Sequence, residues 1–214
     1  MNRLNKIIAI EWISGSWKTT IAKTIANKLW LIHIWESFNF LNIDESFPDV
    51  DINSNEALNS NHNLLLDLEI RKNKQIISSI LSSKDIILER TFLTLLYTEL
   101  ALKDLSKYSN YEVLKSKIDL LISSWKIILP DFIFFLKTNP NIAKERINDR
   151  FWETKHFFKD EKTLNSLYNN LFSIITDNNL LKNIEYEIIE NNWKDDLAKV
   201  IEYVSNKFID IIKK

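Results

Sequence analysis

Glycine is the residue that this sequence of 214 amino acids lacks most clearly, because it contains only one, Gly15. Proteins use about 7% glycine on average, so roughly 15 would be expected in a chain of this length. Turns and the C-terminal ends of helices normally need glycine, because the backbone often takes a left-handed conformation there. The single glycine is therefore an anomaly that needs an explanation.

Cysteine is absent altogether, and only three prolines and one methionine are present. The lack of cysteine excludes disulfide bonds, thiolate zinc sites and a cysteine nucleophile, and it makes the cytoplasm the expected compartment. No apolar run approaches the ~18 residues of a transmembrane helix. The apolar run at residues 7–10 is also too short for the core of a signal peptide. We expect a single domain over residues 1–214.

A dominant sign of charge is also missing, since 28 basic residues face 29 acidic ones and leave a formal net charge of -1. Such a chain has no electrostatic reason to bind nucleic acid or an anionic membrane, and we expect neither as a partner. An apolar fraction of 45% is ordinary for a folded globular protein.

Apolar runs and helical spacings alternate along the chain and predict its secondary structure. Short apolar runs predict strands at residues 6–11, 31–34, 85–88, 131–136 and 186–189. Helical spacing predicts helices at residues 18–29, 62–81, 92–105, 111–124, 141–150, 163–177 and 195–212. Residues 39–61 are predicted to form a loop region, and residues 151–160 are a lid candidate. This order predicts an α/β fold with a five-stranded parallel sheet and helices on both faces.

The segment between the first predicted strand and the first predicted helix nearly matches the phosphate-binding loop, G-x-x-x-x-G-K-[ST]. Spacing, Lys18 and Thr19 agree with the pattern, whereas Trp12 and Trp17 replace its two glycines. In such a loop the backbone N–H groups hold phosphate, the lysine contacts the β- and γ-phosphates, and the hydroxyl residue binds Mg²⁺. The predicted ATP-binding residues are Trp12, Ile13, Ser14, Gly15, Ser16, Trp17, Lys18, Thr19 and Thr20.

The seven tryptophans all occupy places where glycine is usual, and none lies in a clear core stripe of the predicted elements. Those outside the loop are Trp30, Trp35, Trp125, Trp152 and Trp193. We hypothesise that tryptophan stands for glycine at these positions, because some bacteria read the UGA codon as glycine where other code tables translate it as tryptophan. The alternative is a tryptophan-rich protein whose phosphate loop has decayed, since an indole next to Lys18 would hinder phosphate binding.

With glycine at positions 12 and 17 the chain opens with IAIEGISGSGKTT, which resembles the start of thymidylate kinases and deoxynucleoside kinases. The resemblance continues in LLLDLEIRKNKQIISSI (residues 64–80), DIILERT (residues 85–91) and PDFIFFL (residues 130–136). It covers nearly the whole chain and implies a three-layer P-loop kinase fold with a small lid at about residues 146–160. It also implies ATP and Mg²⁺ as cofactors, a small-molecule nucleoside or nucleotide as acceptor, and a homodimer.

The resemblance also assigns roles to charged residues at two predicted strand ends. Arg90 would neutralise the transferred phosphoryl group. Glu89 would bind Mg²⁺ through water or orient the acceptor. Glu36 resembles the carboxylate that acts as base in deoxynucleoside kinases, and a nucleoside hydroxyl needs such a base. The alternatives are a surface pair between Arg90 and Glu89 and a solvated loop position for Glu36.

Three arginines on predicted helices complete the candidate site. Arg71 resembles the thymidylate kinase arginine that holds the acceptor nucleotide, and its alternative is a solvated helix face. Arg146 and Arg150 fall where the family has lid arginines, and they lie four residues apart on one helix face. They would close over the triphosphate, unless they only pair with the neighbouring acidic residues.

The leading functional prediction is ATP-dependent phosphoryl transfer to a (deoxy)nucleoside monophosphate, as in thymidylate kinases. The alternative is a deoxynucleoside kinase that phosphorylates a 5′-hydroxyl. Glu89 in place of aspartate favours this alternative, and the segment after Trp35 lacks the Pro-Gly turn typical of thymidylate kinases. A third alternative is a non-catalytic P-loop protein, which follows if the protein in the cell really has tryptophan at positions 12 and 17.

Overall fold

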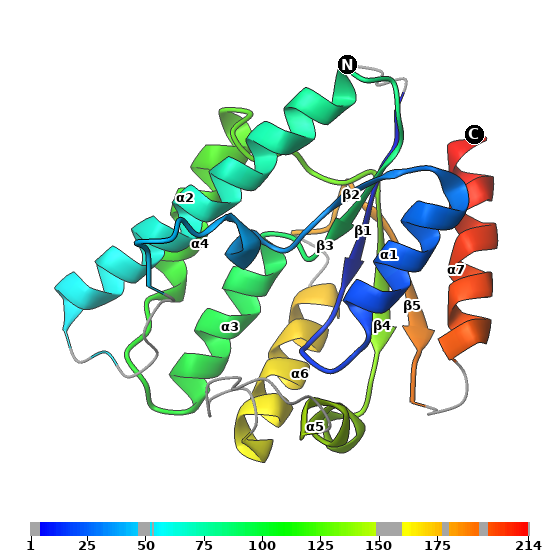
Figure 1. The fold of residues 1–214 in the computed structure, drawn as a ribbon. Coiled ribbons are helices and arrows are strands. Elements are labelled where there is room, and N and C mark those ends of the chain that lie inside the picture. Colours follow the sequence, from blue (N-terminus) through cyan, green and yellow to red (C-terminus); the bar gives the residue numbers. More distant parts are fainter. Residues whose placement is uncertain are drawn as a thin grey trace.

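A sheet of five parallel strands in the order β2-β3-β1-β4-β5 forms the centre of the molecule (Figure 1). The computed structural model describes residues 5–46, 52, 54–148, 160–176, 180–192 and 197–213. The strands are β1 (Ile7–Glu11), β2 (Ile32–Ile34), β3 (Ile86–Glu89), β4 (Phe132–Lys137) and β5 (Glu185–Glu190). The predicted five-stranded parallel sheet is confirmed.

Helices cover both faces of this sheet. The helices are α1 (Lys18–Leu29), the 3-10 helix η1 (Ser37–Phe40), α2 (Asn55–Ile80), α3 (Leu93–Asp104), α4 (Tyr111–Ser123), α5 (Pro140–Asn148), α6 (Glu161–Thr176) and α7 (Leu197–Ile212). Helices α1 and α7 pack together on one face, and α3 and α6 pack together on the other (Figure 1). The predicted three-layer arrangement is thereby confirmed. Within the described residues, no helix has the length and apolarity that a membrane span requires.

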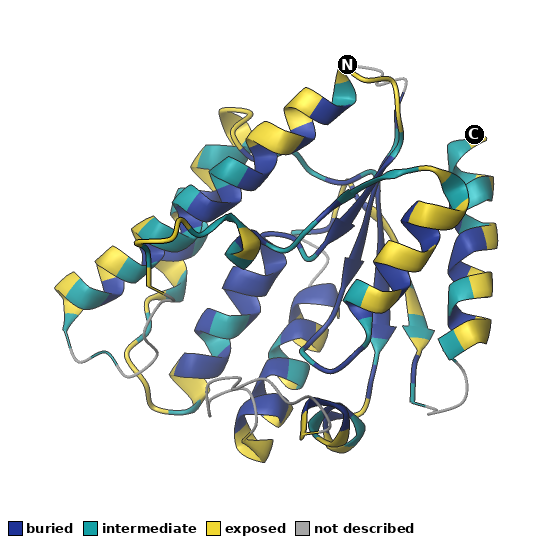
Figure 2. Ribbon diagram, viewed as in Figure 1, coloured by how far each residue is buried: buried dark blue, intermediate teal, exposed yellow. Residues whose placement is uncertain are grey.

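The central strands read as continuous apolar runs because both of their faces are covered. The sequences of β1, IIAIE, and β3, IILE, are buried at every position. The edge strand β5 instead reads EYEIIE, and none of its residues is fully buried. Figure 2 shows this contrast between the buried centre of the sheet and its exposed periphery. The core therefore lies around β1, β3 and β4.

The start of α2 differs from the prediction, because residues 55–61 are helical rather than part of a loop. Asparagine and serine have low intrinsic helix propensity, which hides this first part of the helix in the sequence. Oγ of Ser54 accepts a hydrogen bond from the backbone N–H of Ala57 at 3.1 Å and caps the helix. Glu56 in the first turn adds a favourable interaction with the helix dipole.

The prediction that no tryptophan lies in the core is wrong for Trp12, whose side chain is fully buried. Its ring makes edge contacts with Phe135 and Tyr168, at centroid distances of 6.3 and 5.6 Å. Its indole N–H donates to the carbonyl oxygen of Thr138 at 3.3 Å. Position 12 directly follows the buried strand β1, so a side chain there enters the layer between the sheet and α6.

Candidate active site

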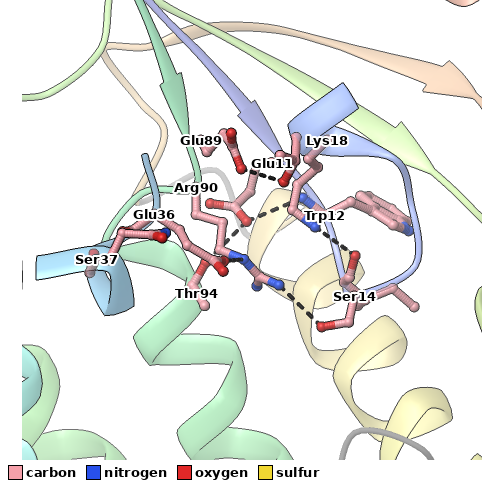
Figure 3. A network of polar contacts seen from close by, with 12 residues as sticks. Glu11, Trp12, Ser14, Lys18, Glu36, Ser37, Glu89, Arg90 and Thr94 are labelled. Carbon is pink, nitrogen blue, oxygen red and sulfur yellow. Dashed lines mark hydrogen bonds and ion pairs between the residues drawn. The ribbon is translucent and has the colours of Figure 1, made fainter. Parts of the chain in front are cut away.

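Polar side chains gather at the end of the sheet where β1, β2 and β3 end (Figure 3). Because these strands are parallel, the segments that follow them lie at the same end of the sheet, which is where α/β folds bind ligands. Glu11 is the last residue of β1, Glu36 follows β2, and Glu89 and Arg90 stand at the end of β3. The fold therefore brings together residues from three distant parts of the chain.

Lys18 is the first residue of α1, and its ammonium group lies within the preceding loop. Nζ donates to the carbonyl oxygen of Ile13 at 2.8 Å and to Oγ of Ser16 at 3.2 Å. Burial lowers the pKa of Lys18 to about 7, and the nearby Arg90 adds to this effect. The loop thus encloses an ammonium group at the place where the motif predicts the phosphate-binding lysine.

Gly15 is required at its position for two reasons. Its φ is +80°, and a Cβ atom there would lie 2.4 Å from the carbonyl oxygen of Ala143. Helix α5 therefore packs directly on the phosphate loop. Nη1 of Arg146 donates to the carbonyl oxygen of Gly15 at 3.4 Å, and burial lowers the pKa of Arg146. One predicted lid arginine thus reaches the loop, and Arg150, with residues 149–159, lies outside the described residues.

Trp17 precedes α1 with a φ of 61°, in the left-handed region. A bulky side chain rarely takes this conformation. The guanidinium carbon of Arg146 lies 3.8 Å from the centroid of the Trp17 ring. The indole therefore covers one face of the cation that reaches the loop.

Arg90 connects the phosphate loop with the segment after β2. Its Nε lies 2.5 Å from Oε2 of Glu36. Nη2 donates to Oγ of Ser14 in the loop at 3.1 Å, and Nη1 donates to the hydroxyl of Tyr97 at 2.9 Å. The φ of Arg90 is 59°, so this arginine is held in an unfavourable backbone conformation, as residues at functional sites often are.

Both members of the Arg90–Glu36 pair stay charged at neutral pH. Burial by itself lowers the pKa of Arg90, but Tyr97, Glu36 and other nearby groups raise it above its ordinary value. Burial by itself raises the pKa of Glu36, but the positive charges of Arg90 and Lys18 outweigh it and lower the pKa. Glu36 is therefore a carboxylate that can accept a hydrogen bond from a hydroxyl group.

Thr19 and Glu89, the two predicted magnesium ligands, lie in contact. Oγ1 of Thr19 donates to Oε2 of Glu89 at 2.6 Å, and Nε2 of His33 lies 2.6 Å from the other carboxylate oxygen. A hydroxyl and a carboxylate oxygen fit the ligand preference of Mg²⁺. The described residues hold no group of three His, Cys, Asp or Glu side chains that could bind a metal by itself. Mg²⁺ here would depend on nucleotide phosphates, as it commonly does.

Glu11 links the start of the phosphate loop to the end of β3. Its carboxylate accepts hydrogen bonds from the backbone N–H groups of Trp12 and Thr91, at 3.1 and 2.7 Å. It also accepts from the hydroxyls of Thr91 and Thr94, at 3.0 and 3.1 Å. Burial raises the pKa of Glu11 although Arg90 and Lys18 oppose this effect. The three hydrogen bonds from Thr91 and Thr94 hold the end of β1 against the segment that follows β3.

Arg71 lies on α2, and the structure does not join it to the Lys18–Arg90 cluster. Its guanidinium donates to both carboxylate oxygens of Glu45, at 2.6 and 2.7 Å, and to the carbonyl oxygen of Phe40 at 3.1 Å. Oδ2 of Asp67 lies 2.5 Å from Nη2. The hydrogen bond from Arg71 lowers the pKa of Glu45 to about 2. Arg71 is therefore held between two carboxylates.

Several residues that support the site were not predicted from the sequence. Nζ of Lys72 donates to the carbonyl oxygens of Glu89 and Arg90, and Nδ2 of Asn191 donates to the carbonyl oxygen of Ser16. Tyr97 and His33 contact Arg90 and Glu89, as described above. Lys72 and Tyr97 could have been noticed in the sequence, because each is a polar residue on the buried face of a helix and such residues usually have a specific partner.

Solved structures of two kinds of kinase resemble this chain over nearly its whole length. The deoxyadenosine kinase from M. mycoides with bound dATP matches with a TM-score of 0.68 at 18% identity, over 94% of this chain and 98% of its own. The thymidylate kinase from Candida albicans has a TM-score of 0.68 at 19% identity, over 98% and 91%. The thymidylate kinase from Ehrlichia chaffeensis has a TM-score of 0.57 at 16% identity, over 98% of this chain and 99% of its own. No protein-family model and no curated protein sequence matches.

These likenesses establish the fold. The chain has the P-loop kinase fold of nucleoside and nucleotide kinases, as its sequence resemblance implied. Deoxyadenosine kinase and thymidylate kinase match it equally well by TM-score. The fold therefore agrees with either kind of acceptor, and the arrangement of the side chains has to distinguish between them.

Proposed function

We propose that this protein transfers the γ-phosphoryl group of ATP to the 5′-hydroxyl of a deoxynucleoside. The observation that carries the proposal is the Glu36–Arg90 pair, which sets an ionised carboxylate beside a cation that also reaches the phosphate loop through Ser14. A hydroxyl acceptor needs a group that takes its proton, whereas a phosphate acceptor is already an anion. The carboxylate of Glu36 would receive that proton as the new P–O bond forms.

The nucleotide would bind on residues 12–20. Loop N–H groups and the N-terminus of α1 would hold the phosphates, and Lys18 would leave Ile13 and Ser16 to contact the β- and γ-phosphates. Thr19 and Glu89 would hold Mg²⁺, directly or through water. Mg²⁺ supplies neutralisation of the negative charge on these phosphates. Arg90 and Arg146 would stabilise the transferred group from two sides.

A nucleoside monophosphate is the second candidate acceptor, and the sequence favoured it. It would need a free cation for its phosphate, and Arg71 was the residue predicted to supply one. In the structure Arg71 is held by Glu45 and Asp67, so an incoming phosphate would have to displace a carboxylate. This arrangement favours an uncharged acceptor, in line with Glu89 in place of aspartate.

The proposal also requires that glycine occupies positions 12 and 17 of the phosphate loop, and the backbone supports this at position 17. Three of the five described tryptophans, Trp17, Trp30 and Trp125, have φ values of 58–61°. A left-handed conformation is unfavourable for any residue with a Cβ atom and natural for glycine. We therefore infer that the protein made in the cell carries glycine at these positions and, by the motif, at position 12.

Trp30 and Trp125 also sit where glycine ends helices. The backbone N–H of Leu31 donates to the carbonyl oxygen of Ala26, and that of Lys126 donates to Leu121, both five residues back. This is the hydrogen bond of the Schellman motif, in which the left-handed residue is usually glycine. Both indoles are exposed, by 84% and 72%, so neither packs in the interior. Mass spectrometry of the native protein decides: tryptophan in these peptides would contradict the inference.

Phosphoryl transfer tests the proposed function itself. The test uses the chain with the four substitutions W12G, W17G, W30G and W125G, which we call the glycine-containing chain. It is assayed with Mg²⁺-ATP and with deoxynucleosides or their monophosphates. We expect labelled monophosphates from the deoxynucleosides, and no binding of Mg²⁺-ATP by the same chain with Lys18→Ala. If the glycine-containing chain fails to bind Mg²⁺-ATP, the kinase proposal falls and the non-catalytic alternative stands.

A further inference from the structure

Two buried, oppositely charged residues of α2 lie behind the site. Lys72 is 1% exposed and Glu69 is 3% exposed, and Nζ of Lys72 lies 3.9 Å from Oε1 of Glu69. Buried charged groups are unfavourable unless they are paired or hydrogen-bonded, and an apolar side chain would fill this helix face at less expense. Their presence therefore calls for a specific role.

The side chain of Lys72 binds the backbone at the end of β3. Nζ donates to the carbonyl oxygen of Glu89 at 3.1 Å and to that of Arg90 at 2.8 Å. The adjoining cavity is lined in part by Glu69, Lys72 and Thr91 and measures only about 10 Å³, which is room for no more than about one water. Because at most about one water fits there, the ammonium group depends mainly on its hydrogen bonds to the two carbonyl groups.

These two carbonyl groups flank the left-handed residue of the site. Arg90 has a φ of 59°, and its own N–H donates to the carbonyl oxygen of Ile10 at 3.0 Å. A conformation that is unfavourable by itself persists only where surrounding contacts fix it. Lys72 supplies contacts on both sides of the Arg90 Cα atom, and this conformation directs the guanidinium toward Glu36 and Ser14.

Glu69 contacts the segment that carries Glu36, the partner of Arg90. Its Oε1 accepts a hydrogen bond from Oγ of Ser37, the residue that follows Glu36 and begins η1. Figure 3 shows Ser37 and Glu36 on the same short segment, with the Glu36 side chain directed toward Arg90. Two residues of α2 that lie one turn apart therefore contact both sides of the Glu36–Arg90 pair. Glu69 binds the residue next to Glu36, and Lys72 binds the backbone around Arg90.

We propose that Lys72 and Glu69 are a positioning pair that sets the distance between Glu36 and Arg90 for phosphoryl transfer. Neither residue contacts the phosphate loop in the hydrogen bonds described above. The pair acts on the turn that aims Arg90 and on the segment that carries Glu36. This inference rests on the proposed function, because the pair would position the proton acceptor and the cation of that reaction.

Lys72→Met tests the pair, with Lys74→Met as the matched control on an exposed position of the same helix. Both are made in the glycine-containing chain. We expect K72M to lower kcat for the acceptor at least about tenfold, because small displacements of reacting groups have large effects on rate. The dissociation constant of Mg²⁺-ATP should change less than about twofold, and K74M should change neither quantity. An equal loss of nucleotide affinity in K72M would overturn the positioning role.

Hydrogen exchange gives a readout that does not need activity. The N–H groups of Arg90 and Thr91 are bonded to Ile10 and Glu11, and loss of the Lys72 contacts should loosen this turn. We expect exchange at these two amides to accelerate about tenfold or more in K72M and to stay unchanged in K74M. Unchanged exchange in K72M would overturn the positioning pair. An inactive parent chain with accelerated exchange in K72M would instead overturn the proposed function alone.

Ser37→Ala keeps the test decisive if K72M does not fold. The change removes only the hydrogen bond between Ser37 and Glu69 and leaves the buried charges in place. We expect kcat to fall about threefold to tenfold with the affinity for Mg²⁺-ATP unchanged. An unaltered kcat in S37A would contradict the link from α2 to Glu36.

Discussion

The phosphate side of the site (residues 12–19 with α5) and its acceptor side (residues 36–45 with α2) handle positive charge differently. On the phosphate side, Lys18 donates to a backbone carbonyl and a hydroxyl, which are neutral groups. On the acceptor side, Arg71 is held by the carboxylates of Glu45 and Asp67. Neutral partners are easily exchanged for an anion, whereas carboxylates compete with it. This difference supports the proposal of a polyphosphate on the first side and an uncharged acceptor on the second.

Removal of the Glu36 charge should have the largest effect on this comparison. In the glycine-containing chain, Glu36→Gln removes the group that takes the proton of the hydroxyl, and we expect kcat with a deoxynucleoside to fall about 100-fold. Mg²⁺-ATP binds on the other side, so its affinity in equilibrium titration should change little. Full activity in E36Q would show that the acceptor side needs no base.

The pKa of Lys18 predicts a pH dependence of nucleotide affinity. Burial lowers this pKa to about 7 in the free protein, and bound phosphates would raise it again because they favour the charged form. The complex then binds more protons than the free protein, so affinity falls as the pH rises above about 7. Between about pH 7.5 and 9 we expect roughly a 20-fold loss, measured by titration calorimetry. Lys18→Arg stays protonated and should show a flat profile over this range.

A smaller change should come from the Arg71–Glu45 pair. Glu45→Gln removes one of the two carboxylates that hold Arg71, so a monophosphate acceptor would compete better for the guanidinium. We expect the dissociation constant of a deoxynucleoside monophosphate to fall about fivefold, within the range of exposed ion pairs, and the KM for a deoxynucleoside to stay the same. If both change together, Glu45 shapes the site by packing rather than by charge.

The smallest expected effect concerns stability at the helix ends far from the site. W30G and W125G each remove a left-handed tryptophan and should raise the free energy of unfolding by about 1 kcal/mol in urea denaturation. Trp35 is a matched control, because its φ is not positive and its ring contacts His33 and Lys23. W35G should therefore leave stability unchanged or lower it.

The phosphate side could be predicted from the sequence because its information is local. A buried apolar strand, a loop of fixed spacing and a helix follow one another within residues 7–29, and Lys18 and Thr19 occupy fixed places in that pattern. The apolar runs of β3 and β4 could be predicted for the same reason. Trp12 was misjudged because burial depends on the layer that covers the end of β1.

The acceptor side could be predicted only in part, because its contacts join distant segments. Glu36 and Arg90 were predicted as site residues, but their ion pair depends on β2 and β3 being neighbours in the sheet. Nothing in the sequence indicates that Glu45 would hold Arg71 across 26 positions. The left-handed turn at Arg90 and the buried Lys72 beneath it are also properties of the assembled fold.

A competition in a single reaction tests the choice of acceptor most directly. The glycine-containing chain receives γ-labelled Mg²⁺-ATP and an equimolar mixture of deoxynucleosides and their monophosphates, and the label is followed into separated products. Because the acceptor side holds Arg71 in ion pairs and offers the Glu36 carboxylate, we predict label in deoxynucleoside monophosphates and none in diphosphates. Label confined to the diphosphates would contradict the proposed acceptor.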